Sequence, residues 1–143
     1  MNKNMNQGKF IAVVGVGYVG LQCVKAFAEA GLLVIGYDIN EQRVNELKNN
    51  TDSNAQLEGF DSCTMQFTST LEDIAEANIY LITVPTPVKN KRPDLSPLAS
   101  AVDNIGTLLN PGDLVICEST IAPGTTEEFI LPRLESKSGA MKI

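Results

Sequence analysis

Short apolar runs alternate with amphipathic stretches along the whole chain. The run 10–14 (FIAVV) is apolar at every position, which is typical of a central parallel strand buried on both faces. Pro85 and Pro87 follow another run and end it, because proline cannot donate to a strand ladder. The apolar runs predict five strands, at residues 10–14, 33–37, 66–68, 79–84 and 114–117.

The stretches between these runs carry the periodicity and the end signals of helices. Residues 18–30 show an apolar stripe and stop before Gly31. Ser96 is the expected N-cap of a helix over 96–109, with Pro97 at its first position. Further helices are expected at 40–49, capped by Asn40, and from Thr125 or Thr126 to about 136, and residues 70–73 are expected to open a short helix. Residues 50–65 are expected to form a loop that could hold one helical turn. An exposed segment is expected at 89–94 and a turn at 111–113.

This order of strands and helices predicts an α/β fold. Right-handed crossovers between the strands give a doubly wound parallel sheet in three layers, α/β/α. The length of 143 residues suits one domain, so residues 1–143 are expected to form a single folding unit.

Composition narrows the classes of function. The chain has 17 acidic residues against 11 Lys and Arg, so its surface repels nucleic acid and anionic lipid. No apolar run approaches the ~18 residues that span a bilayer, and the N-terminus lacks the apolar stretch of a signal peptide. We expect a cytoplasmic protein that binds neither nucleic acid nor membranes.

Histidine is absent and the three cysteines show no CxxC spacing. The absence of histidine removes the commonest general base and the commonest metal ligand. The cysteine pattern suggests neither a disulfide framework nor a zinc site, so no metal is expected.

A GxGxxG motif stands between the first strand and the first helix. Gly15 would make the tight turn, Gly17 would admit a diphosphate to the backbone, and Gly20 would let the helix pack closely on the strand. The free N–H groups of the helix would then bind the phosphates. This pattern is typical of Rossmann folds, although a tight turn without a ligand has the same sequence.

Asp38 ends the second strand, 23 positions after Gly15. A carboxylate at this point accepts hydrogen bonds from the adenosine ribose and repels the additional phosphate of NADP, which favours NAD. Arg43 leaves alternatives open, because it could reach a 2′-phosphate, stack on adenine or pair with Asp38.

Hydroxyl groups follow the fourth and fifth strands, where ligands of open α/β sheets bind. Thr86 could face a cofactor ribose, and Ser119 and Thr120 could bind the nicotinamide end or a catalytic water. Alternatively, Pro85 and Pro87 merely stop a strand and Ser119 and Thr120 cap the last helix. Glu118 could be a base, a water-orienting group or a structural hydrogen-bond acceptor.

Four ordered segments resemble the UDP-glucose/GDP-mannose dehydrogenase family, and most closely its UDP-N-acetylhexosamine branch. They are GVGYVGLQ, YDIN followed by Arg43, VPTPV followed by PDLSPL, and ESTIAPGTTEE. The resemblance implies an N-terminal NAD-binding domain. It places Tyr18 and Val19 at the diphosphate, Asp38 and Arg43 at the adenosine ribose, and Thr86 and Thr120 at the nicotinamide half.

The family oxidises the C6 alcohol of a nucleotide sugar to a carboxylate for polysaccharide precursors, and Thr120 matches a threonine that helps position the catalytic water. The family's cysteine nucleophile and sugar-binding domain lie beyond residue 143, and its enzymes form homodimers. Cys23, Cys63 and Cys117 are therefore expected to serve packing, and Gln22-Cys23 replaces the usual Pro-Leu. We expect the chain to bind NAD without turning over a UDP-sugar.

Two other hypotheses remain at this point. A stand-alone regulatory module that senses NAD(H) has a similar length and a similar glycine turn with an acidic residue. The N-terminal half of an NADP-dependent hydroxyacid dehydrogenase is permitted by Arg43 and disfavoured by Asp38.

Overall fold

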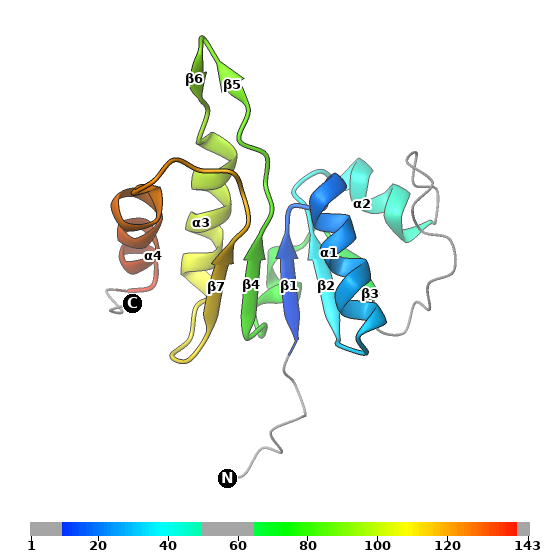
Figure 1. Cartoon of the computed structure of the whole chain (residues 1–143). Coiled ribbons are helices and arrows are strands. Elements are labelled where there is room, and N and C mark those ends of the chain that lie inside the picture. The colour runs from blue at the N-terminus through cyan, green and yellow to red at the C-terminus, as the bar shows by residue number, and fades with distance from the viewer. Residues whose placement is uncertain (1–9, 50–64, 140–143) are drawn as a thin grey trace.

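The computed structural model describes residues 10–49 and 65–139 of the chain. Its centre is a parallel sheet in which the strand order is β3-β2-β1-β4-β7 (Figure 1). The order reverses at β1, which pairs with β2 on one side and β4 on the other. The strands of this sheet are β1 (Ile11–Val14), β2 (Val34–Tyr37), β3 (Met65–Thr68), β4 (Ile79–Ile82) and β7 (Leu114–Cys117).

Helices cover both faces of the sheet. Successive side chains of a strand point to opposite faces, and accordingly Ala12 and Val14 pack in one buried cluster while Ile11 and Val13 pack in another. The first cluster includes side chains of η1 (Leu71–Ile74), α3 (Ser96–Leu108), η2 (Thr126–Ile130) and α4 (Leu131–Lys137); the second includes those of α1 (Tyr18–Glu29) and α2 (Glu41–Lys48). The predicted three-layer doubly wound fold is confirmed.

The predicted elements are present, with three local corrections. Strand β4 ends at Ile82 rather than at residue 84. Ser96 is the first residue of α3 and not its cap; the Asp94 carboxylate accepts hydrogen bonds from the N–H (3.0 Å) and hydroxyl (2.6 Å) of Ser96. These bonds hold the pKa of Asp94 below its ordinary value. The last helix is split into a π-helical turn, η2, and α4, since Pro132 has no N–H to donate to the preceding turn.

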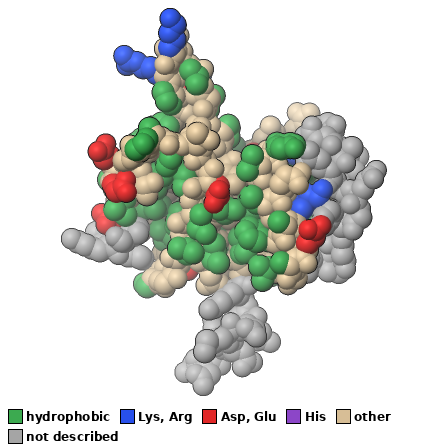
Figure 2. Space-filling view, viewed as in Figure 1, with side chains coloured by type: hydrophobic (Ala, Val, Ile, Leu, Met, Phe, Trp, Pro, Cys, Tyr) green, Lys and Arg blue, Asp and Glu red, His purple; other side chains and the backbone are tan. Residues whose placement is uncertain are grey.

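A small hairpin interrupts the segment expected to be an exposed loop. Strands β5 (Val88–Lys89) and β6 (Arg92–Pro93) pair antiparallel and project beyond the end of the sheet (Figure 1). Asn90 and Lys91 form its turn at positive φ, 49° and 63°, without the glycine that usually signals such a turn. The exposure was predicted correctly, and Figure 2 shows Lys and Arg side chains gathered at the tip.

The predicted loop 50–65 lies outside the described residues except for Met65, which begins β3. Among the helices that the structure describes, none combines the length and apolar character needed to cross a bilayer.

Candidate functional site

A cavity of about 650 Å³ lies at the carboxyl ends of β1, β2, β4 and β7. It opens where the strand order reverses around β1, the position at which ligands of open α/β sheets bind. Its walls come from five segments: the turn after β1, the loop after β2, the segment after β4, one side of α3 and the segment after β7.

The three glycines of the turn meet different constraints. Gly15 has φ +100°, and its N–H donates to the Tyr37 carbonyl at 2.8 Å. A Cβ on Gly20 would lie 1.8 Å from the Gly15 carbonyl oxygen, whereas a Cβ on Gly17 would meet nothing within 4 Å. Gly17 lines the cavity, so its missing side chain leaves space on the ligand side of the turn.

Asp38 connects the end of β2 to this turn. Its Oδ2 accepts a hydrogen bond from the Val16 N–H, and its Oδ1 accepts one from the Asn40 N–H, both at 2.9 Å. The carboxylate is thereby held in place on the cavity wall. Each carboxylate oxygen has further lone-pair capacity, so Asp38 can still accept bonds from ligand hydroxyls.

Arg43 also lines the cavity, and it is held from the side of the turn. Its Nε donates to the Val16 carbonyl at 3.0 Å, and its Nη1 lies 3.7 Å from the Glu46 carboxylate. The turn is thus bound at Val16 from both directions, by Asp38 at the N–H and by Arg43 at the carbonyl. The sequence suggested three roles for Arg43, and holding the glycine turn was not one of them.

The segments after β4 and β7 are tied together across the sheet. The Thr86 hydroxyl donates to the Thr120 carbonyl at 2.9 Å, and the Ser119 hydroxyl donates to the Val84 carbonyl at 2.8 Å. Thr86 and Thr120 line the cavity, while Ser119 is not among its lining residues. The segment after β4 is therefore more than a strand stop, and the Ser119 hydroxyl braces it rather than capping the last helix.

Glu118 lines the cavity at the end of β7, and its N–H donates to the Ile82 carbonyl at 2.9 Å. Burial raises the pKa of the Cys23 thiol, and the Glu118 charge raises it further. A protonated thiol is a weak nucleophile, and neither Cys23 nor Cys117 lines the cavity. Both positions fit the packing role expected of them; Cys63 lies outside the described residues.

The α3 wall is the part of the cavity that the sequence did not indicate. It is formed by Pro97, Ser100, Ala101 and Asn104, and Tyr37 lines the same cavity. The sequence predicted this helix from its end signals, but which ligand-facing segment the helix approaches depends on the tertiary fold. Burial raises the pKa of Tyr37, and the Asp38 and Glu72 charges add to this effect.

Residues 9–143 match the UDP-glucose/GDP-mannose dehydrogenase family, NAD binding domain. UDP-N-acetyl-D-glucosamine 6-dehydrogenase of Salmonella typhi is 46% identical over 133 residues, which cover 90% of this chain and 31% of that protein. UDP-N-acetyl-D-mannosamine dehydrogenase of Pyrococcus horikoshii is 36% identical over 126 residues, 83% of this chain and 30% of that protein.

The solved structure of a Pyrococcus horikoshii UDP-D-ManNAc dehydrogenase superposes with a TM-score of 0.83 at 34% identity. The superposition covers 94% of this chain and 33% of that one. The chain thus spans about a third of the length of these relatives.

Proposed function

The chain belongs to the UDP-glucose/GDP-mannose dehydrogenase family through its NAD-binding domain, and from this premise we propose that it supplies the cofactor site of a UDP-sugar 6-dehydrogenase. The observation that carries the proposal is the Asp38 carboxylate, fixed against the glycine turn by the Val16 N–H and exposed to the cavity. Family membership also favours this hypothesis over an NAD(H)-sensing module and over an NADP-dependent hydroxyacid dehydrogenase.

The residues present fit NAD. Gly17 leaves room for the diphosphate beside the first turn of α1, whose free N–H groups and partial positive charge favour anions. Tyr18 and Val19 flank that position, and Asp38 accepts bonds from the adenosine ribose. Asp38 also repels a 2′-phosphate, which is the physical basis for selecting NAD over NADP.

Bound NAD would supply the hydride acceptor for oxidation of the substrate alcohol. The Thr86 hydroxyl donates to the Thr120 carbonyl on the cavity wall, and we assign both residues to the nicotinamide half of NAD. We also assign to Thr120, as a residue of the cavity wall, the orientation of a water molecule for hydrolysis. Ser119 acts indirectly, because its bond to Val84 keeps the two segments at a fixed separation.

The proposed substrate is a UDP-N-acetylhexosamine, because the relatives at 46% and 36% identity are named for UDP-N-acetyl-D-glucosamine and UDP-N-acetyl-D-mannosamine. Conversion of the C6 alcohol to a carboxylate removes two hydrides in succession. Of the cysteines in the described part of the chain, neither Cys23 nor Cys117 lines the cavity. The chain covers about a third of the length of these relatives, and we propose that the nucleophilic cysteine and the sugar site belong to the remainder of such an enzyme. The proposed setting is a cytoplasmic homodimeric enzyme that makes polysaccharide precursors.

Two measurements test the proposal. Calorimetry on residues 1–143 should detect NAD binding tighter than NADP binding. In the full-length enzyme, UDP-N-acetylglucosamine or UDP-N-acetylmannosamine should yield two NADH for each sugar oxidised, and residues 1–143 alone should yield none. Turnover by residues 1–143 alone, or tighter binding of NADP than NAD, would contradict it.

A further inference from the structure

Four residues of α3 share one side of the helix and line the cavity: Pro97, Ser100, Ala101 and Asn104. Their spacing of three and four residues is that of a single helix face. Asp103, directed elsewhere on the same helix, binds Arg133 of α4 through two hydrogen bonds of 3.1 and 3.2 Å. Asp103 therefore holds α3 against α4, and it is not one of the side chains that α3 presents to the cavity.

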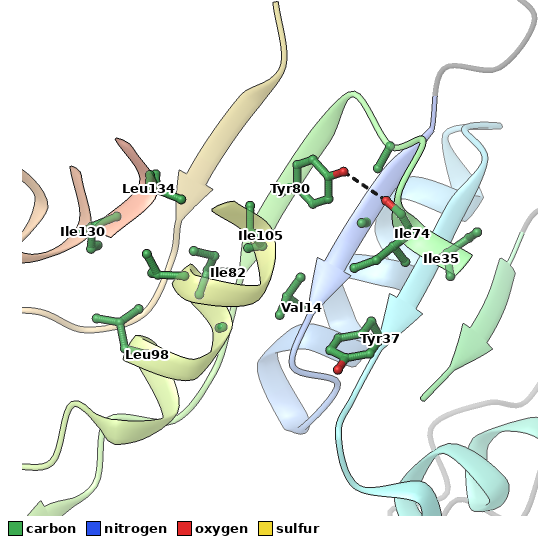
Figure 3. Packing of buried hydrophobic residues seen from close by; sticks show 14 residues of the cluster. Val14, Ile35, Tyr37, Ile74, Tyr80, Ile82, Leu98, Ile105, Ile130 and Leu134 are labelled. Atoms are coloured by element: carbon green, nitrogen blue, oxygen red, sulfur yellow. Dashed lines mark hydrogen bonds between the residues drawn. The ribbon is translucent and has the colours of Figure 1, made fainter. Parts of the chain in front are cut away.

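This α3 face lines the same cavity as Tyr37 and Asp38 at the end of β2. Ala101 belongs to the same buried cluster as Val14 and Tyr37. In Figure 3, Val14 stands between the α3 residues Leu98 and Ile105 on one side and Tyr37 on the other. Tyr37 directly precedes Asp38 in the sequence. Through Ala101, the α3 face is thus part of the buried cluster that contains Tyr37, the residue before Asp38, and both Tyr37 and Asp38 line the same cavity as that face.

The position of Asp38 determines which portion of NAD this space receives. Asp38 accepts bonds from the adenosine ribose, and the glycine turn takes the diphosphate attached to that ribose at its other end. The base projects from the ribose away from the diphosphate. We place the base beside Tyr37 and the α3 face, which line the same cavity as Asp38.

The chemistry of the α3 face matches a purine. Val14, Tyr37 and Ala101 give the cavity an apolar lining on which a flat ring can pack. Among the hydrogen bonds of the described residues, none involves the Asn104 side-chain amide or the Ser100 hydroxyl; the Thr107 hydroxyl bonds to the backbone carbonyl of Asn104, not to its amide. A carboxamide carries a donor and an acceptor side by side, which complements the 6-amino group and N7 of adenine.

We propose that Asn104 recognises the adenine base of NAD, its side-chain amide pairing with the 6-amino group and N7, while Ser100 borders the same edge. This inference rests on the NAD-binding function proposed above. It makes α3 a determinant of base specificity, separate from Asp38, which discriminates at the ribose.

The test compares NAD with its hypoxanthine analogue, which replaces the 6-amino donor with a carbonyl acceptor. Calorimetry on the unmodified 143-residue chain should show the analogue binding about fivefold to tenfold more weakly, the effect of losing one hydrogen bond. The Asn104→Ala variant should bind NAD more weakly than the unmodified chain by a similar factor, and it should bind NAD and the hypoxanthine analogue with equal affinity. Asn45→Ala is the matched control, because Asn45 is exposed on α2 and does not line the cavity.

The outcomes separate this inference from the proposed function. A chain that binds NAD and the hypoxanthine analogue with equal affinity overturns the role of Asn104 and leaves the NAD site intact. A chain that binds neither dinucleotide overturns the NAD site itself. The comparison on the unmodified chain does not depend on the folding of Asn104→Ala, whose helix content is checked by circular dichroism.

Discussion

At the scale of single residues, the glycine turn shows how one motif combines separate physical demands. Gly20 is required by packing, since a Cβ there would overlap the Gly15 carbonyl oxygen. Gly15 is required by its φ of +100°, which disfavours a side chain. Neither requirement applies to Gly17, because its φ is −71° and a Cβ there would meet no other atom within 4 Å. A ligand on the cavity side, which Gly17 lines, gives this position a reason to be glycine.

This contrast predicts different effects for two identical substitutions. Gly17→Ala should fold with nearly unchanged stability but bind NAD at least about tenfold more weakly, because the methyl group takes the space of the diphosphate. Gly20→Ala should lose at least about 2 kcal/mol of unfolding free energy through overpacking. Urea unfolding and calorimetry measure the two effects. If Gly17→Ala and the unmodified chain bind NAD with equal affinity, the diphosphate does not bind at this turn.

Asp38 is predicted to control affinity and cofactor choice together. Asp38→Asn should weaken NAD by about tenfold or more, since hydrogen bonds to a charged group contribute about 1.5–3 kcal/mol, and it should narrow the preference for NAD over NADP. Asp113→Asn is the control, because the Asp113 carboxylate also accepts a backbone N–H, from Asn110 at 2.8 Å, outside the cavity. If both variants bind NAD like the unmodified chain, the ribose assignment fails.

At the scale of elements, β4 is connected to η1 through a buried phenol. The Tyr80 hydroxyl donates to the Ile74 carbonyl at 3.0 Å and to the Ala75 carbonyl at 3.3 Å (Figure 3 shows the first bond). Tyr80 is fully buried. Burial, aided by the Asp113 charge, raises the pKa of Tyr80 from its ordinary 10.0 to about 12.

This raised pKa predicts an alkaline loss of stability. The phenol is neutral in both states below pH 10, so its contribution is complete there. Above pH 10 the unfolded chain loses the Tyr80 proton first, and the contribution disappears as the pH approaches 12. Urea unfolding from pH 8 to 12 should show this loss in the unmodified chain and a shallower one in Tyr80→Phe. At pH 8, Tyr80→Phe should cost about 1 kcal/mol. Parallel pH profiles would contradict the assignment.

At the scale of the whole molecule, the cavity joins segments that are separate in the sequence. Its walls come from residues between Val14 and Thr120, and both faces of the sheet contribute through α1 and α3. A ligand in this position contacts the folded chain and has no equivalent site in the unfolded one. Binding and folding stability are therefore linked.

The linkage predicts that NAD stabilises the chain. At a concentration one hundred times its Kd, NAD should raise the unfolding free energy by about 2.7 kcal/mol, and NADP at the same concentration should raise it less. The chain has three tyrosines and no tryptophan, so circular dichroism is a suitable probe of the thermal transition. Gly17→Ala should show a smaller shift at the same NAD concentration. An identical shift with NAD and NADP would refute cofactor selection by Asp38.

The sequence by itself determined the alternation of strands and helices, the three layers, the glycine turn and the carboxylate at the end of β2. These features follow from local periodicity and from backbone conformations, which neighbouring residues dictate. Only the tertiary structure decided that Ser119 braces Val84 from 35 positions away, that Arg43 holds the Val16 carbonyl, and that α3 forms a cavity wall. Such roles depend on distances between segments remote in sequence, and no local pattern encodes those distances.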